Sequence, residues 1–196
     1  LHDYDVPLEL CSTVTEVKGR DRVEALVKQQ VDKDWQPIPG SEELIPCDTL
    51  LLSVGLIPEN ELSRMAGVEL DPVTGGPFVD ERFATNVPGI FAAGNVVHVY
   101  DVVDDVTESA EHAGACAARY VRNGDRDDQH CMSLQPGTNV RHIVPQTLHP
   151  AFLGKESVTL HLRVKSPIEQ PVRLEARLGE QVVASRRLRY ARPSEM

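Results

Sequence analysis

The sequence predicts an α/β fold followed by a small antiparallel β unit, and three observations carry this prediction. The apolar run at residues 47–54 leads through a glycine into a helical pattern, as expected for a buried strand that feeds a helix. Residues 107–121 place apolar side chains on one stripe at helical spacing. From residue 158 onward apolar and polar residues alternate, which is typical of antiparallel strands.

The first elements of the chain are extended. Residues 8–17 roughly alternate between apolar and polar side chains, and residues 22–31 predict a return strand after a turn. We therefore expect a β hairpin here. A loop rich in Pro and Gly follows at 34–41, and the run at 47–54 is expected to form a strand that is buried on both faces.

Two helices and a short strand are expected in the middle of the chain. Residues 58–66 suit a short helix that ends at a glycine. Residues 89–93 predict a second short buried strand, and the helix at 107–121 comes after it. Because Asp is favoured at helix amino termini, we expect Asp104 or Asp105 to cap this helix.

The charge distribution indicates a boundary near residue 138. From there to the end the chain has ten Lys and Arg against five Asp and Glu, whereas the preceding part has ten against 25. The polar, turn-forming stretch 122–129 suits a linker. After the boundary, the period-two pattern predicts strands at 158–164, 172–178 and 181–190.

Composition excludes several classes of protein. A formal net charge of −10 argues against a nucleic-acid partner, because binding to phosphates needs a basic face. No apolar run approaches the roughly 20 residues that a membrane-spanning helix needs. No signal-peptide pattern opens the chain, so we expect a cytoplasmic location.

The cysteines and histidines predict no metal or disulfide centre. None of the four cysteines forms a CxxC pair, which excludes a simple redox disulfide or a zinc knuckle, and we expect reduced, mostly packed thiols. His142, His149 and His161 have no spacing that indicates metal binding. We expect these three histidines to lie on the surface or in packing positions.

The segment TNVPGIFAAGN at residues 85–95 is the clearest candidate for a ligand-facing loop. Gly94 lets a ligand approach the backbone, Asn95 offers a short polar side chain, and a helix begins soon afterwards. In nucleotide-binding α/β sheets, ligands lie near the carboxyl ends of strands and the amino termini of helices. On spacing alone, however, a plain strand–turn–helix with a small-residue turn is the favoured interpretation.

Two segments together resemble the pyridine nucleotide-disulfide oxidoreductase superfamily. Residues 85–95 resemble its second flavin motif, with Asn95 where the family has an acidic residue that hydrogen-bonds the flavin ribityl chain. Residues 47–60, CDTLLLSVGLIPEN, resemble the crossover that returns from the NAD(P)H domain to the FAD domain. Residues 53–81 and 94–121 resemble, more narrowly, the FAD/NAD(P)-dependent dehydrogenases that are associated with glycerol-3-phosphate dehydrogenases.

The resemblance implies a C-terminal fragment of a fold with two Rossmann-like dinucleotide-binding domains. Residues 1–54 would end the NAD(P)H-binding domain, residues 55–128 would be the C-terminal segment of the FAD-binding domain, and residues 138–196 would form the small antiparallel β domain. The chain starts at Leu1 and contains no GxGxxG. We therefore expect FAD and NAD(P)H to bind only together with a missing N-terminal half.

The resemblance also implies which residues serve the flavin. His98 lies where the subgroup covers the flavin pyrimidine edge, and it is a weak candidate for donating a hydrogen bond or moving a proton. The alternative, which the sequence supports to the same degree, is that His98 and Tyr100 only line the wall of the pocket. The expected cofactor-binding residues are Gly55, Pro58, Gly94, Asn95, Val102, Val103 and Asp104.

The function expected from this resemblance is that of an FAD-dependent NAD(P)H oxidoreductase. In the full-length protein, hydride would pass at the flavin N5 atom, whereas the fragment alone is expected to be inactive. A partner dehydrogenase or oxidase subunit and self-association through exposed sheet edges are further expectations. The alternative is a non-catalytic docking or assembly module with a degenerate flavin site, which the Asn at position 95 favours.

Overall fold

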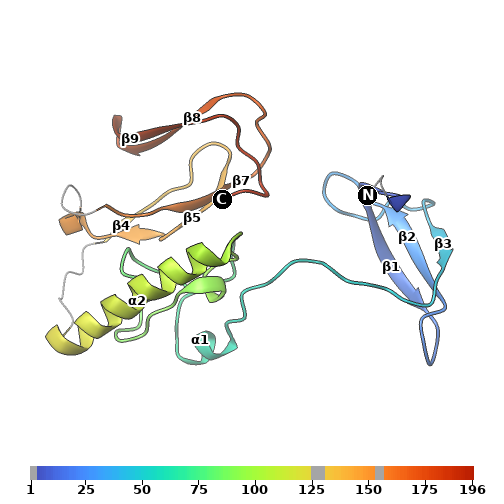
Figure 1. Ribbon diagram of the computed structural model, residues 1–196, viewed down its shortest axis with the longest axis horizontal. Coiled ribbons are helices and arrows are strands. Elements are labelled where there is room, and N and C mark those ends of the chain that lie inside the picture. Colours follow the sequence, from blue (N-terminus) through green and yellow to red (C-terminus); the bar gives the residue numbers. More distant parts are fainter. Residues whose placement is uncertain (1–3, 125–130, 153–156) are drawn as a thin grey trace. The chain divides into compact units, whose positions relative to one another are not determined.

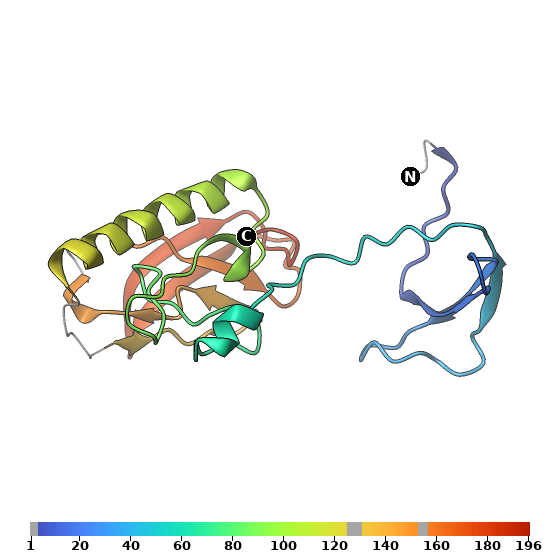
Figure 2. The same ribbon diagram turned by 90° about the horizontal axis from the view of Figure 1, so that it is seen from below.

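The computed structural model describes residues 4–124, 131–152 and 157–196 (Figures 1 and 2). The chain divides into two compact units, Leu1–Gly55 and Leu56–Met196. The second unit contains both the residues around the flavin-like motif and the C-terminal strands. The assignment of these segments to cofactor-binding domains stays a prediction.

The first unit is a three-stranded antiparallel sheet. It consists of β1 (Ser12–Lys18), β2 (Ala25–Gln30) and β3 (Glu43–Pro46), in the order β1-β2-β3. The predicted hairpin is confirmed by the β1–β2 pairing. Its turn requires Gly19, because a Cβ atom there would lie 1.9 Å from the carbonyl oxygen of Arg22.

The predicted strand at 47–54 is wrong. β3 ends at Pro46; the N–H of Cys47 still donates to the carbonyl of Glu24 at 3.2 Å, but no strand forms at residues 48–54 within the described residues. Leu51 is 90% exposed and Val54 86% exposed. A strand that is buried on both faces needs neighbouring strands on both edges, and the described part of this chain provides none for this run.

The second unit begins with a short helix and a loop. α1 (Glu61–Met65) is shorter than the predicted helix at 58–66, and Gly67 follows it with φ of +78°, a conformation that favours glycine. The predicted strand at 89–93 is wrong, because only one bridge, between Ala84 and Phe91, forms there. Thr85 and Ile90 instead close a turn through the N–H of Thr85 and the carbonyl of Ile90.

The long helix is confirmed and extends beyond its predicted bounds. α2 (Val103–Asn123) follows the short 3-10 helix η2 (Gly94–Val96). Its N-cap residue is Val102, and no side chain caps the helix. The expected capping by Asp104 or Asp105 is therefore wrong; both lie in the first turn, where their charges still favour the helix dipole.

The C-terminal strands form three separate antiparallel pairs, β4–β6, β5–β7 and β8–β9; Figure 1 labels all of these strands except β6. The antiparallel β unit is thus confirmed, with strand bounds that differ from those predicted. Two of the pairs precede residue 165, and a 3-10 helix, η3 (Pro150–Phe152), lies between β6 and β7 in the chain. The strands are β4 (Met132–Ser133), β5 (Val140–Val144), β6 (Thr147–Leu148), β7 (His161–Val164), β8 (Val172–Leu178) and β9 (Gln181–Leu188).

A small apolar core joins α2 to these strands. Ala113 of α2, Val144 of β5 and Val97 belong to one buried cluster, together with Val79 and Phe83. Burying such side chains contributes about 1.5–3 kcal/mol each for the larger ones. Within the described residues, no helix is both long and apolar enough to cross a bilayer.

One buried glutamine fixes the strands to the loop before α2. Gln146 is buried, and its side-chain oxygen accepts the N–H of Val79 at 3.0 Å. Its own backbone N–H donates to the carbonyl of Val79 at 3.1 Å, and its side-chain amide donates to Asp71 at 3.2 Å. Because buried polar groups need partners, this residue stabilises the junction between two distant segments.

Candidate functional site

The flavin-like motif ends in a tight loop that leads to α2. Gly94 is buried and has φ of +71°, which an L side chain rarely adopts. Asn95 is exposed, and its side-chain oxygen accepts the N–H of Tyr100 at 3.2 Å. The loop therefore presents a polar side chain to solvent while its backbone stays fixed.

The amino terminus of α2 is open. Val102 at the N-cap is extended, and the first backbone N–H groups receive no side-chain cap. Val102, Val103 and Asp104 are all exposed. Uncapped N–H groups at a helix start are donors for an electron-rich ligand edge, although Asp104 and Asp105 oppose a fully charged anion.

Asn60 joins the two segments that resemble the family motifs. Its side-chain amide donates to the carbonyl of Val96 at 2.8 Å and to that of Gly75 at 3.0 Å. Its side-chain oxygen accepts the hydroxyl of Ser63 at 2.8 Å. This fully buried asparagine was not among the predicted site residues, although it ends the Gly-x-x-Pro segment that the sequence pattern contains.

The remaining predicted cofactor residues lie at the start of this segment. Pro58 is half-buried, and its Cδ atom would lie 4.0 Å from a Cβ atom built on Gly75. Gly55 closes the first unit with φ of +85°, and a Cβ atom there would meet nothing within 4 Å. The structure thus brings Gly94, Asn95 and the helix start together, but shows no close approach at Gly55.

His98 lies in the interior. It is 2% exposed, and its ring centroid lies 4.1 Å from that of Tyr100. The rings of His142 and His161 are also near, at 5.8 and 5.7 Å. Burial lowers the pKa of His98 to about 3 and also lowers the pKa values of the other two histidines. At neutral pH this cluster is uncharged, so His98 is not a ready proton donor.

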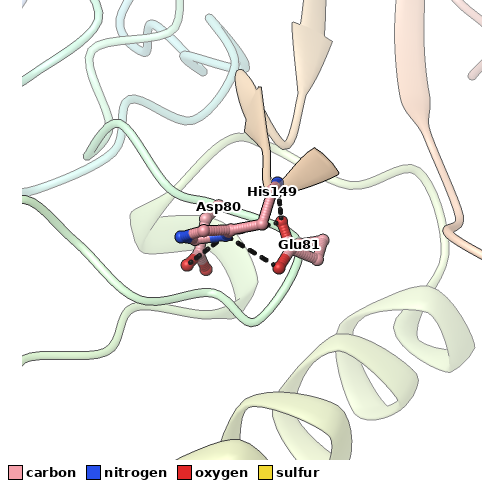
Figure 3. Close-up of side chains that lie close together, drawn as sticks. All are labelled: Asp80, Glu81 and His149. Carbon is pink, nitrogen blue, oxygen red and sulfur yellow. Dashed lines mark hydrogen bonds and ion pairs between the residues drawn. The ribbon is translucent and has the colours of Figure 1, made fainter. Parts of the chain in front are cut away.

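A second cluster of ionisable side chains was not predicted. Figure 3 shows Asp80, Glu81 and His149, whose ligand-type atoms lie within 4.8 Å of one another. His149 Nδ1 lies 3.0 Å from Glu81 Oε1, and burial raises the pKa of Asp80. The two carboxyl groups are adjacent in sequence, but His149 is 68 residues away, so no local spacing could have found this group.

The cluster already contains a cation. Arg82 Nε lies 3.3 Å from Glu81 Oε1 and 3.5 Å from Asp80 Oδ2. Its Nη2 atom lies 3.0 Å from each ring nitrogen of His149. Because this guanidinium places a positive charge beside both carboxylates, it compensates their charge without a metal ion.

Comparison with known proteins identifies the class to which this fold and these motifs belong. The family model described as "Pyridine nucleotide-disulphide oxidoreductase" matches residues 1–117, which is more than half of the chain. The chain belongs to this family of flavin-dependent pyridine nucleotide oxidoreductases, which have a Rossmann-like FAD/NAD fold.

The alignments with individual relatives cover only a small part of each of those proteins. The beta subunit of an NADP(+)-dependent formate dehydrogenase from Moorella thermoacetica is 27% identical over 128 residues, which is 60% of this chain and 17% of that protein. A mitochondrial dihydrolipoyl dehydrogenase of Caenorhabditis elegans is 44% identical over 59 residues (30% and 12%). A thioredoxin reductase of Listeria monocytogenes is 36% identical over 85 residues (43% and 24%).

Proposed function

We propose that this chain is the C-terminal part of an FAD-dependent NAD(P)H oxidoreductase. The observation that carries the proposal is the link from Asn60 to Val96, because it ties the crossover segment to the flavin-like loop. The proposed subgroup is that of the dehydrogenases associated with glycerol-3-phosphate dehydrogenases. The chain spans 12% to 24% of the three relatives above, so the activity belongs to a longer protein.

The residues around the loop fit the ribityl and pyrimidine parts of a flavin. Gly94 has a positive φ that an L side chain rarely adopts, and Asn95 exposes an amide that donates and accepts hydrogen bonds. The uncapped start of α2 would donate to the pyrimidine edge, with Val102 and Val103 against its apolar surface. When bound, FAD would supply hydride transfer at its N5 atom.

The flavin proposal is tested on the full-length protein that contains this chain. A yellow product whose absorbance bleaches with NADH or NADPH under anaerobic conditions is the expected result. Asn95→Ala should weaken flavin retention about tenfold, the loss of one hydrogen bond. Asn95→Asp is the matched control, because it keeps an acceptor for the N–H of Tyr100. A colourless protein that does not take up FAD would contradict the proposal.

A docking or assembly module is the second candidate, and the exposed apolar run favours it. Leu51, Leu52 and Val54 expose most of their surface, and apolar surface of this kind marks an interface. The relative from Moorella is itself named as a subunit. A colourless full-length protein that co-purifies at fixed stoichiometry with a dehydrogenase or oxidase subunit would favour this candidate over the enzyme.

A further inference from the structure

The thiol of Cys131, the imidazole of His149 and the carboxylate of Glu81 form a chain of contacts that starts at the surface and ends in the buried cluster. Cys131 Sγ lies 3.2 Å from His149 Nε2, and His149 Nδ1 lies 3.0 Å from Glu81 Oε1. Cys131 is exposed, whereas His149 and Glu81 are buried. We propose that these three residues form a reactive-thiol site, at which Cys131 exchanges with low-molecular-weight disulfides.

The hydrogen bonds of Glu81 define which nitrogen of His149 faces the thiol as an acceptor. Its carboxylate accepts the backbone N–H of His149 at 2.9 Å through Oε2 and contacts ring Nδ1 through Oε1. A carboxylate only accepts, so Nδ1 carries the proton of the neutral ring. The lone pair of Nε2 is then shared between Cys131 Sγ, at 3.2 Å, and Arg82 Nη2, at 3.0 Å, and when it faces Cys131 it can take the thiol proton.

Arg82 adds a positive charge at the same place. Its Nη2 atom lies 3.0 Å from His149 Nε2, the nitrogen that contacts Cys131 Sγ. A cation near a thiol favours the thiolate, which is the nucleophilic form. An imidazolium forms when His149 accepts the proton, and Arg82 would repel it. The carboxylates of Asp80 and Glu81 pair with Arg82 and so reduce this repulsion.

The exchange step is balanced by the disulfide itself. Cys131 transfers its proton to His149 Nε2, and the thiolate attacks one sulfur of the small disulfide. A new S–S bond forms at Cys131 as the old S–S bond breaks. The departing thiolate takes the proton from His149, so a mixed disulfide and one free small thiol result without another oxidant.

Two other cysteines provide internal controls. Cys11 is exposed, and no described residue places a histidine in hydrogen-bond contact with it. Cys116 has a histidine neighbour but is 3% exposed. That neighbour, His112, uses Nε2 to donate to the carbonyl of Glu81 at 2.9 Å, so this nitrogen carries a proton and cannot accept one from Cys116, 3.7 Å away. Only Cys131 among these three combines exposure with an accepting imidazole.

The proposal is tested by the reaction of the native full-length protein with 4,4′-dithiodipyridine, a neutral disulfide. Timed quenching and peptide mass spectrometry give a separate rate for each cysteine. At about pH 6, where an ordinary thiol is almost entirely protonated, Cys131 should react at least about tenfold faster than Cys11, and Cys116 should be slowest. After denaturation the rates should converge. Equal native rates at Cys131 and Cys11 would overturn the proposal.

Variants separate the base from mere exposure. His149→Gln should reduce the Cys131 rate to that of Cys11, and Glu81→Gln should reduce it partly, because Glu81 positions the ring rather than touching the disulfide. His161→Gln is the matched control and should leave Cys131 unchanged. Cys116 reports folding in the same sample, because it stays slow only while its site is buried. An unchanged Cys131 rate in a folded His149→Gln protein would refute the site.

Discussion

Single buried histidines make this molecule sensitive to acid. His98 has a pKa of about 3 in the folded chain, against 6.5 for the free side chain, because burial penalises its charged form. As the pH falls below 6.5, the unfolded chain takes up the proton first, so stability is complete above this pH and is lost toward pH 3. His142 and His161 act in the same direction.

A pH series of urea denaturation measures this effect. We expect the free energy of unfolding to fall as the pH is lowered from 6.5, with His98 alone contributing up to about 1.4 kcal/mol per pH unit. His98→Leu should flatten the slope, because it removes the group that titrates. Val121→Ala, at an exposed position on α2 without a titratable side chain, should not change it. A slope that is identical in His98→Leu and the unmodified chain would contradict this account.

At the scale of elements, two loop segments approach so closely at Gly76 that no larger residue fits there. A Cβ atom on Gly76 would lie 1.8 Å from the carbonyl oxygen of Val97, within the backbone that follows η2. The backbone would have to shift, because a carbonyl cannot rotate away as a flexible side chain can. Gly76 therefore holds the loop of residues 71–77 against the flavin-like motif.

Gly76→Ala should destabilise the chain by about 3 kcal/mol, the upper end for overpacking a buried site. Gly114→Ala is the matched control, because Gly114 lies on α2 with nothing within 4 Å of its built Cβ atom. That substitution should stabilise by about 0.5–1 kcal/mol, since glycine costs helix entropy. Urea denaturation compares the two variants, and a Gly76→Ala protein as stable as the unmodified chain would show that the loops separate easily.

The elements that were predicted correctly have local signals. The hairpin β1–β2 and helix α2 follow from periodicity within one segment, which the residues themselves encode. The apolar side chains at 47–54 also predict a buried strand, but the described residues contain no strands that would cover this run. The strand predicted at residues 89–93 is wrong because Pro88 and Gly89 favour a turn that competes with a strand.

The sites differ in the signals that they leave in the sequence. The loop at Gly94 and Asn95 could be singled out, since a glycine at a positive φ next to a helix start leaves a short sequence pattern, and its role toward a flavin stays a prediction. The cluster of Glu81, Cys131 and His149 was not predicted, because its members meet only through tertiary packing. Sequence spacing carries no information about contacts across 68 residues.

At the scale of the whole chain, the extended run should be the first target of proteolysis. Leu51, Leu52, Leu56 and Ile57 are mostly exposed, and proteases cleave extended backbone without ladder hydrogen bonds. Limited chymotrypsin treatment of the isolated 196-residue chain should cut first within 51–57. In the longer protein proposed above, neighbouring strands should protect this run. Equal cleavage in both forms would show that no other part of the protein covers it.

The hydrogen bonds of Val79 to Gln146 and of Glu81 to His149 set the order in which this unit can mature during synthesis. Each joins groups 67 or 68 residues apart. At about 5–20 residues per second, a ribosome needs several seconds to deliver the later partner after the earlier one. During that interval the polar groups of Val79 and Glu81 remain hydrated. The loop before α2, which contains both residues, can therefore pack into the core only after β5 and β6 have been synthesised.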